Sequence, residues 1–378
     1  MRKEKYFAIS PRIARWKLDN SLENWLSYKA DFSEFWRKIY ILYYKIFDSK
    51  YYSVGVKMAE NAIKTYGIEQ HISNIDDVIR DMIYCLHRFG YSFQDYCIYD
   101  FVNNKDINYR TSFVADKLRY HYCDILNSPE VFKIMTNKYA CYEKYRKFYK
   151  REVVGCISED DWVNFTNFIS THKRFIYKPL EEHSGHGIEI VNVDEINTTD
   201  FFSKKLASGA FIIEELIDQA DETACIVNTV RVLTFTINNK VDILASAWRI
   251  GSGGAIKDNA GSGGMYAFVN PQSGIVETDA INYNGSHFEK HPDSGLVFKG
   301  FKMPFWKDAV SLIEEMAISL HGTTLIAWDI AYSKKGWVMV EANENGDFSI
   351  LQSNKKEGLK DTLYLYMDKY FNAKAVSK

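Results

Sequence analysis

The chain has 378 residues, of which 46% are hydrophobic and 15% aromatic, and its 47 basic and 49 acidic residues give a net charge of -2. This length and composition are typical of a globular chain with two or three packed subdomains. Because there is no basic excess, nucleic acid and anionic membrane surfaces are not expected as partners, and small molecules are.

The cysteines and the chain start indicate the compartment. Six cysteines are scattered without C-x-x-C pairs and without a cluster of histidines, which argues against zinc and against a disulfide framework. Residues 1–5 lead into no apolar segment, and no stretch approaches the length of an uncharged membrane span. The sequence therefore predicts a cytoplasmic protein without a signal peptide or a transmembrane helix.

Residues 1–130 are rich in aromatic side chains, contain few Gly or Pro, and are predicted to be helical. One stripe recurs at steps of three and four residues and comprises Trp25, Phe32, Phe35, Trp36, Ile39 and Tyr43. That spacing indicates an amphipathic or buried helix, and core packing is the preferred interpretation over a sugar- or nucleotide-binding platform.

Beyond Pro129 the pattern changes from helical to mixed. A helix is predicted over 131–149, and short strands alternate with Gly-rich turns from Phe175 until a last helix near 359–370. The predicted fold class is therefore α+β, with an α-helical, aromatic-rich region in front of it.

A strand at 175–179 carries Lys178 near its end and is followed by a loop at 180–187 and a second strand at 188–191. Glycine lets backbone N–H groups approach an anion, and a strand-borne Lys neutralises phosphate charge, so this pattern predicts a phosphate-binding lid. An ordinary Gly-containing hairpin loop is the alternative interpretation. The lid residues would be Ser184, Gly185, His186 and Gly187.

An apolar strand at 211–217 contains Glu214 and Glu215 near its end, and Asp221 and Glu222 follow closely. Such acids either cap a loop or accept hydrogen bonds from an amino group or from ribose hydroxyls. The residues alone leave both interpretations open.

Two further strands are predicted at 230–237 and 241–250. If a three-residue loop joins them, Arg231 and Arg249 are diagonal neighbours on one face and together favour an anion. If the loop has two residues, the arginines face opposite ways. The Gly-rich segment that follows includes Asn259 and suits either a mobile loop near a ligand or disorder.

The most specific chemical pattern is a hairpin predicted from strands at 325–332 and 337–342. A three-residue loop with Gly336 in its left-handed position makes Ser333 oppose Trp337. Counting outward from that pair places Asp329 opposite Glu341.

Asn343 then shares the face of these two carboxylates. Like charges directly opposed across a ladder destabilise it by about 0.2 to 1 kcal/mol, so Asp329 and Glu341 favour a cation. The apolar flanks of both strands favour a covered pair over a solvated one. Oxygen ligands of this kind suit Mg²⁺, which commonly bridges to substrate phosphates.

In this order the features resemble the ATP-grasp superfamily over about residues 131–350. The resemblance implies an α+β ATP-grasp fold in which two subdomains grip ATP. The small subdomain would span 131–217 with the lid at 180–187, the large one would span 218–378 with the metal site, and the α-helical region would span 1–130.

The resemblance also implies roles for individual residues. Two lysines would hold the ATP phosphates, the strand end and the residues after it would hold adenine, an acid would hold ribose, and the hairpin would hold Mg²⁺. These are Lys138 and Lys178; Glu214, Glu215, Leu216 and Ile217; Asp221 or Glu222; and Asp329, Glu341 and Asn343. In addition, Arg249, Asn259, Gly263 and Gly264 look like the R…N…GG stretch of glutamate-ligase-like members.

Two N-terminal motifs, at 87–90 and at Asp95-Tyr96, look more specifically like the sugar-transfer-associated ATP-grasp proteins of surface-polysaccharide synthesis. That resemblance implies an ATP- and Mg²⁺-dependent carboxylate–amine ligase that works through an acylphosphate and attaches an amine or amino acid to a carboxylated sugar. Lys178, Arg231 and Arg249 would carry the catalysis. Other polysaccharide-biosynthesis proteins are the expected macromolecular partners.

Two alternatives remain open. One is an ATP-grasp phosphotransferase with a catalytic histidine, for which His183, His186 and His321 are candidates by position. The other is a non-catalytic nucleotide-binding scaffold of a polysaccharide assembly complex, with the aromatic N-terminal region as its docking surface.

Overall fold

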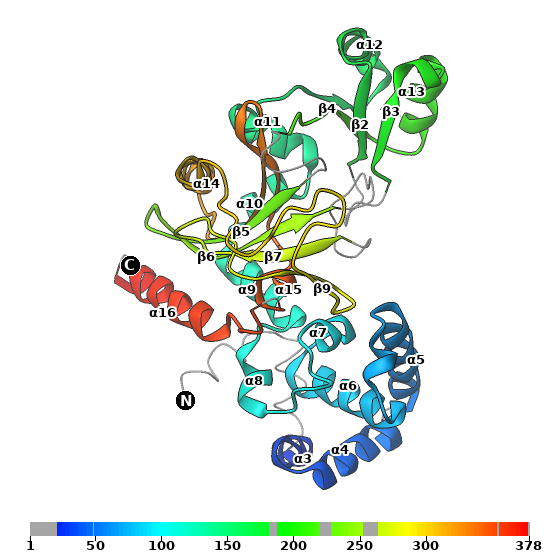
Figure 1. Cartoon of the computed structure of the whole chain (residues 1–378), viewed down its shortest axis with the longest axis vertical. Helices are drawn as coiled ribbons and strands as arrows, with labels where there is room; N and C mark the ends of the chain where they lie inside the picture. Colours follow the sequence, from blue (N-terminus) through cyan, green and yellow to red (C-terminus); the bar gives the residue numbers. More distant parts are fainter. Residues whose placement is uncertain are drawn as a thin grey trace. The chain divides into compact units, whose positions relative to one another are not determined.

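The computed structural model describes residues 21–47, 49–180, 187–219, 228–251, 264–353 and 355–376. The chain divides into two compact units (Figure 1). Unit 1 combines the chain up to Asp124 with Tyr283–Ser286 and with the chain from Asp347 onward, and unit 2 comprises Ile125–Asn282 and His287–Gly346. The subdomain boundaries proposed at 130 and 217 stay predictions.

Unit 1 is helical in its described residues. Its elements are α3 (Ser21–Phe32), α4 (Glu34–Phe47), α5 (Ser49–Thr65), η1 (Ile68–His71), α6 (Ile75–Phe89), α7 (Phe93–Ile98), α8 (Ile107–Ser112), most of α9 (Asp116–Leu126), α15 (Ser349–Ser353) and α16 (Lys360–Val376). In the ranges that the structure describes, no helix is both long and apolar enough to span a membrane.

The aromatic stripe is only partly packed as its spacing predicts, since Trp36, Ile39 and Tyr43 are half-buried and its other members are exposed. Phe32 ends α3 and Glu34 begins α4, so the break between them interrupts the helical phase on which the prediction relied. Trp25, Phe32 and Phe35 are 46%, 68% and 65% exposed. The core side of these two helices is formed instead by other positions, namely Leu26, Ala30, Tyr40, Ile41 and Tyr44.

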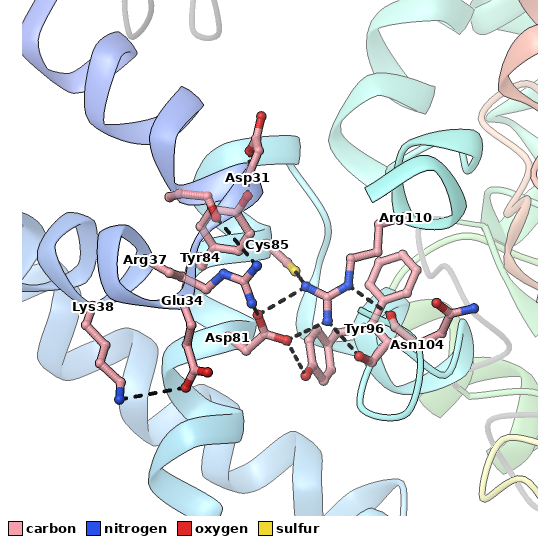
Figure 2. A network of polar contacts seen from close by, with 12 residues as sticks. Asp31, Glu34, Arg37, Lys38, Asp81, Tyr84, Cys85, Tyr96, Asn104 and Arg110 are labelled. Atoms are coloured by element: carbon pink, nitrogen blue, oxygen red, sulfur yellow. Dashed lines mark hydrogen bonds and ion pairs between the residues drawn. The ribbon is translucent and has the colours of Figure 1, made fainter. Parts of the chain in front are cut away.

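A buried polar network joins four helices of unit 1, namely α4, α6, α7 and α8 (Figure 2). Asp81 of α6 accepts from Arg110 of α8 at 2.5 and 3.1 Å, from Arg37 of α4 at 3.0 Å and from the Tyr96 hydroxyl at 2.8 Å. Burial opposes the charge on Asp81, but the guanidiniums outweigh it and keep the pKa of this carboxyl below its ordinary value. Tyr96 belongs to one of the N-terminal motifs and thus has a structural role.

The other motif residues also stabilise unit 1. Arg88 makes a double hydrogen bond to Asp31 at 2.8 and 2.6 Å. His87 stacks on Tyr44 with ring centroids 4.0 Å apart. Asp95 completes a capping box at the start of α7. These contacts supply a physical reason for the motifs that is independent of any ligand.

Unit 2 begins with two helices rather than the single helix predicted over 131–149. They are α10 (Pro129–Met135) and α11 (Lys138–Tyr149). Asn137 separates them because its side chain accepts hydrogen bonds from the N–H groups of Tyr139 and Ala140, which makes it the N-cap of α11. Lys138 is therefore the first residue of a helix.

A small antiparallel sheet has the order β1-β4-β2-β3. Its strands are β1 (Val153–Cys156), β2 (Arg174–Pro179), β3 (Glu189–Asn192) and β4 (Phe211–Glu215), and helices α12 (Trp162–Thr171) and α13 (Thr198–Ala207) accompany it. An aromatic core that includes Phe165, Phe202 and Phe211 holds both helices to the sheet. The two strands predicted on either side of the loop at 180–187 are confirmed as β2 and β3.

A larger antiparallel sheet has the order β11-β10-β5-β6-β7-β8-β9. Figure 1 labels β5, β6, β7 and β9 of this sheet. Its strands are β5 (Thr229–Ile237), β6 (Lys240–Ile250), β7 (Met265–Val269), β8 (Ala280–Asn282), β9 (His287–Phe288), β10 (Leu325–Ser333) and β11 (Gly336–Asn343). One face of this sheet packs into a core with α10, α11 and α14 (Trp306–Ser319), and Trp248, Trp328 and Trp306 are among its largest members. The predicted α+β class is confirmed.

Candidate functional site

The β10–β11 hairpin brings Asp329 directly opposite Glu341, as the sequence predicts. The turn that produces this pairing differs from the predicted one. Gly336 has the predicted left-handed conformation (φ 78°), yet it pairs with Ser333, so that only two residues form the turn and Trp337 opposes Tyr332. A β-bulge between Asp329 and Ile330 then inserts one residue on β11 and restores the register.

The β5–β6 hairpin shows the same combination. Its turn has two residues, Asn238 and Asn239, both with positive φ, whereas the predicted diagonal placement of Arg231 and Arg249 required a three-residue loop. A bulge opposite Leu233 and Thr234 compensates for the shorter loop. Arg231 opposes Ala247 while Arg249 opposes Thr229, so the two arginines are diagonal neighbours on one face.

These strands gather four charged side chains on the sheet face opposite the tryptophan core. Arg231 donates to both carboxylate oxygens of Asp329 at 2.9 and 2.8 Å, and Arg249 donates to Asp329 Oδ2 at 2.7 Å. Burial alone would raise the pKa of Asp329, but the charges of Arg231 and Arg249 outweigh it and lower that pKa to about 2. Asp329 is therefore a buried, ionised carboxylate held by two guanidiniums.

Glu341 is the fourth charged side chain on this sheet face, and it is exposed. Neighbouring protein atoms desolvate the Glu341 carboxyl group and thereby raise its pKa, and the charge of the facing Asp329 carboxylate raises it further. Asn343 Nδ2 donates to Glu341 Oε1 at 3.3 Å. The donor set of two opposed carboxylates and one amide fits a hard divalent cation, because a cation relieves the repulsion that raises the pKa of Glu341.

No group of three or more His, Cys, Asp and Glu side chains in metal-binding geometry occurs among the described residues. The candidate site has two carboxylates and an amide, which is a different composition. Of the predicted pair, Asp329 is covered as expected, whereas Glu341 is solvent-accessible.

A second polar cluster lies in the small sheet around buried Glu214, near the end of the interior strand β4. Lys178 Nζ lies 2.8 Å from Glu214 Oε1, and Arg151 donates to Glu214 Oε2 at 3.2 and 2.8 Å. Burial disfavours the charge, but Lys178 and Arg151 outweigh it and lower the pKa of Glu214 to about 2. The Glu214 side chain is thus occupied by protein partners and holds Lys178 in place.

Lys138 lies at the end of β2. Its Nζ donates to the carbonyl oxygen of Pro179 at 2.8 Å and to that of Leu180 at 3.3 Å. These carbonyls end β2, the strand that carries Lys178, and stand at the start of the predicted lid. The structure therefore brings both predicted phosphate lysines to one end of β2.

The segment after β4 runs beside the turn of the β10–β11 hairpin. Gln219 forms a bridge with Ser333, the backbone N–H of Lys334 donates to the Asp218 carbonyl, and Lys335 lies 3.0 Å from Glu215. Leu216 and Ile217, the predicted adenine contacts, belong to this segment and are partly exposed.

Several predicted site residues lie outside the described part of the chain. They are Ser184, Gly185 and His186 of the lid, Asp221 and Glu222, and Asn259 with Gly263. Gly187, at the end of the lid, is described and has a φ of 70°, which suits glycine.

Arg151 is the residue of this site that sequence reasoning missed. It lies between α11 and β1, and 8% of its surface is exposed. Besides Glu214, it donates to the carbonyl oxygen of Met339 on β11. An arginine between a helix and a strand carries no motif, so only its tertiary contacts identify it.

The chain is similar to one described family and to several solved structures. A family model described as sugar-transfer associated ATP-grasp matches residues 100–365. No curated protein matches the chain. Among solved structures, D-alanyl-alanine synthetase A from Vibrio cholerae is 12% identical with a TM-score of 0.42, over 65% of this chain and 67% of that one.

Two other structures are similarly distant. ATP-grasp ligase PsnB, solved with a minimal precursor, is 11% identical with a TM-score of 0.41 over 68% of both chains. An L-amino acid ligase from Bacillus licheniformis is 10% identical with a TM-score of 0.38, over 62% of this chain and 48% of that one. The chain thus spans about half the length of the latter protein.

Proposed function

Since the chain belongs to the sugar-transfer associated ATP-grasp family and has the predicted ATP-grasp fold behind an aromatic-rich helical region, we propose that it is a carboxylate–amine ligase. ATP-grasp family members are ATP-dependent ligases, and the fold binds ATP with Mg²⁺. The proposed acceptor is a carboxylated sugar of a capsule or surface polysaccharide, and the donor is an amine or amino acid. The family's association with sugar transfer supports this choice of acceptor.

The observation that carries the proposal is the charged sheet face. Asp329 and Glu341 face each other in register, with Asn343 beside them and two arginines bonded to Asp329. When bound, Mg²⁺ would be held by Asp329, Glu341 and Asn343 and would offset phosphate charge. Oxygen ligands near paired guanidiniums suit a reaction in which negative charge moves between phosphate oxygens.

In the proposed reaction a substrate carboxylate oxygen attacks the γ-phosphorus of ATP, and the bond to the bridging oxygen breaks to release ADP. The amine nitrogen then attacks the acyl carbon of the acylphosphate, phosphate leaves, and the nitrogen loses a proton to form the amide. Lys138 and Lys178 bind the phosphates, while Arg231 and Arg249 offset charge at the transferring group.

The remaining residues bind the rest of the nucleotide in this proposal. Glu214 positions Lys178, and the backbone of the segment from Glu215 to Ile217 binds adenine. Asp221 or Glu222 binds ribose, and the lid of Ser184, Gly185, His186 and Gly187 covers the phosphates together with Asn259. The enzyme would act in the cytoplasm, where ATP is available.

Calorimetry of ATP binding with and without Mg²⁺ tests the site. Lys178→Ala removes a charge-assisted contact and Glu341→Gln removes a metal ligand, so each should weaken MgATP binding by about 10- to 100-fold. Lys173→Ala and Glu314→Gln, both at exposed positions, serve as matched controls and should bind like the wild-type protein. Absence of MgATP binding by folded wild-type protein would contradict the proposal.

Product analysis separates the reaction types. Incubation with ATP, sugar acids and amines should yield ADP, phosphate and an amide. Release of AMP and pyrophosphate would exclude the acylphosphate route. A stable phosphorylated product without an amide would instead indicate a phosphotransferase, and normal polymer synthesis with the Glu341→Gln protein would indicate a scaffold.

A further inference from the structure

We propose that Arg151 is a positioning residue that ties the phosphate lysine Lys178 to the metal ligand Glu341. This inference rests on the proposed function. A single guanidinium bonds on one side to Glu214, which holds Lys178, and on the other side to the backbone that carries Glu341. Arg151 touches neither nucleotide nor metal in this arrangement, so it acts through the groups that do.

The contact on β11 falls on the bulge. Met339 pairs with Ile330 and Glu341 pairs with Asp329, which leaves Val340 as the inserted residue. A bulge disrupts the ladder locally and leaves its extra residue unpaired. Arg151 Nη1 donates to the Met339 carbonyl oxygen, and Nη2 reaches the Val340 carbonyl oxygen at 3.4 Å. These bonds stabilise the backbone immediately before Glu341.

On β4, both carboxylate oxygens of Glu214 have a cationic partner. Glu214 Oε2 accepts from Arg151 Nε and Nη2, and Oε1 lies 2.8 Å from Lys178 Nζ. The side chains of Arg151 and Glu214 are each 3% exposed and that of Lys178 is 12% exposed. Because the group is buried, its electrostatic interactions are little screened by salt and its members have few alternative partners.

Only arginine fits this position. Its planar guanidinium offers five N–H donors. Here Nε and Nη2 donate to Glu214, and Nη1 donates to the Met339 carbonyl oxygen on the other side. The Arg151 guanidinium also lies 4.5 Å from the centroid of the Tyr149 ring, which further fixes its orientation. A lysine would keep a positive charge beside Glu214 but could not hold the carboxylate and both carbonyls with the same geometry.

The test uses the full-length protein with Arg151→Lys. Binding of Mn²⁺ without nucleotide, followed by electron paramagnetic resonance, reports the metal site independently of turnover. We expect Mn²⁺ affinity to fall by about tenfold, as residues that orient metal ligands typically do. ATP binding should weaken by a similar factor with Mg²⁺ and by less in EDTA. Arg146→Lys, at an exposed position of α11, should leave both affinities unchanged.

A double-mutant cycle distinguishes positioning from general damage. If Arg151 acts through Glu341, the double variant Arg151→Lys/Glu341→Gln should bind Mn²⁺ no more than about twofold worse than Glu341→Gln alone. Losses that multiply would overturn the inference, as would equal losses of ATP affinity with and without metal, or no loss in Arg151→Lys.

Two further results keep the test decisive. If Arg151→Lys fails to fold, Arg151→Gln/Glu214→Gln removes the opposite charges of this one buried pair together and should show the same loss of Mn²⁺ affinity; unchanged affinity would overturn the inference. If Arg151→Lys binds MgATP as tightly as the wild-type protein does, only the role of Arg151 is refuted. Wild-type protein that binds neither Mn²⁺ nor MgATP would refute the proposed function as well.

Discussion

Single carboxyl groups in this protein differ widely because their neighbours differ. Asp329 and Glu214 face cationic side chains, and their pKa values lie near 2. Asp95 is equally buried but faces another acid, Asp116, and burial followed by that charge raises its pKa to about 7. Ion pairing stabilises the first two as anions, whereas Asp95 remains protonated in the folded protein at mildly acidic pH.

Asp95→Asn tests this difference. The unfolded chain ionises Asp95 above about pH 3.8, whereas the folded protein keeps its proton up to about pH 7, so wild-type stability falls as pH rises between these values. Asn can still accept the backbone hydrogen bonds from Ser92 and Asp116 but cannot ionise. The free energy of unfolding of Asp95→Asn minus that of the wild-type protein should therefore rise by up to about 4 kcal/mol from pH 4 to pH 7.

Urea denaturation at several pH values measures this effect. Exposed Asp76→Asn, on the helix before Asp95, is the control and should show no such trend. A difference between Asp95→Asn and wild type that stays constant with pH would contradict the assignment.

At the scale of elements, caps and turns decide where helices and strands begin. Asn137 caps α11 and thereby sets Lys138 at the helix start. Asn137→Ala should lower the free energy of unfolding by about 1 kcal/mol, whereas Asn137→Ser should retain most of it. Thermal unfolding checks this, with exposed Asn167→Ala as the control; equal stability of Asn137→Ala and wild type would show that the cap is unimportant.

The turn between β5 and β6 allows a second test at this scale. Asn238 and Asn239 both have positive φ, a conformation that β-branched residues tolerate poorly. Asn239→Val should lower the free energy of unfolding by about 1 to 2 kcal/mol, and Asn239→Gly should preserve it. Chemical denaturation of both variants measures these changes. Equal destabilisation by Val and Gly would indicate a lost side-chain contact instead of backbone strain.

The hairpins also show how far element-scale reasoning reaches. Alternation predicted strands at β10 and β11 and the facing of Asp329 and Glu341, and the register confirms both. The loop length predicted for β10–β11 was wrong, and in β5–β6 a two-residue turn does not put the arginines on opposite faces as expected. In both hairpins a turn and a bulge compensate for each other and leave the same residues opposed. A bulge has no pattern of its own in the sequence, since its cause is the fit of one strand against its neighbours.

For the whole molecule, nucleotide binding should appear as added stability of the native state. With free MgATP at about 100 times its dissociation constant, the free energy of unfolding should rise by about 2.7 kcal/mol. The same concentration should stabilise Lys178→Ala and Glu341→Gln much less. Denaturation curves with MgATP, with Mg²⁺ alone and with ATP in EDTA provide the measurement, and equal stabilisation of all three proteins would place the nucleotide elsewhere.

The sequence by itself determined the α+β class and the strand that carries Lys178, because hydrophobic periodicity and strand alternation are local properties. The resemblance of its motifs identified the family. Alternation also put Asp329 and Glu341 on one face, whereas their direct pairing depends on the turn and the bulge. Tertiary structure alone decided that the stripe at Trp25 and Phe35 is exposed and that Arg151 joins two strands. Such contacts join residues far apart in the chain, 63 positions for Arg151–Glu214 and 98 for Arg231–Asp329. Their partners depend on how the strands and helices pack, which no local pattern encodes.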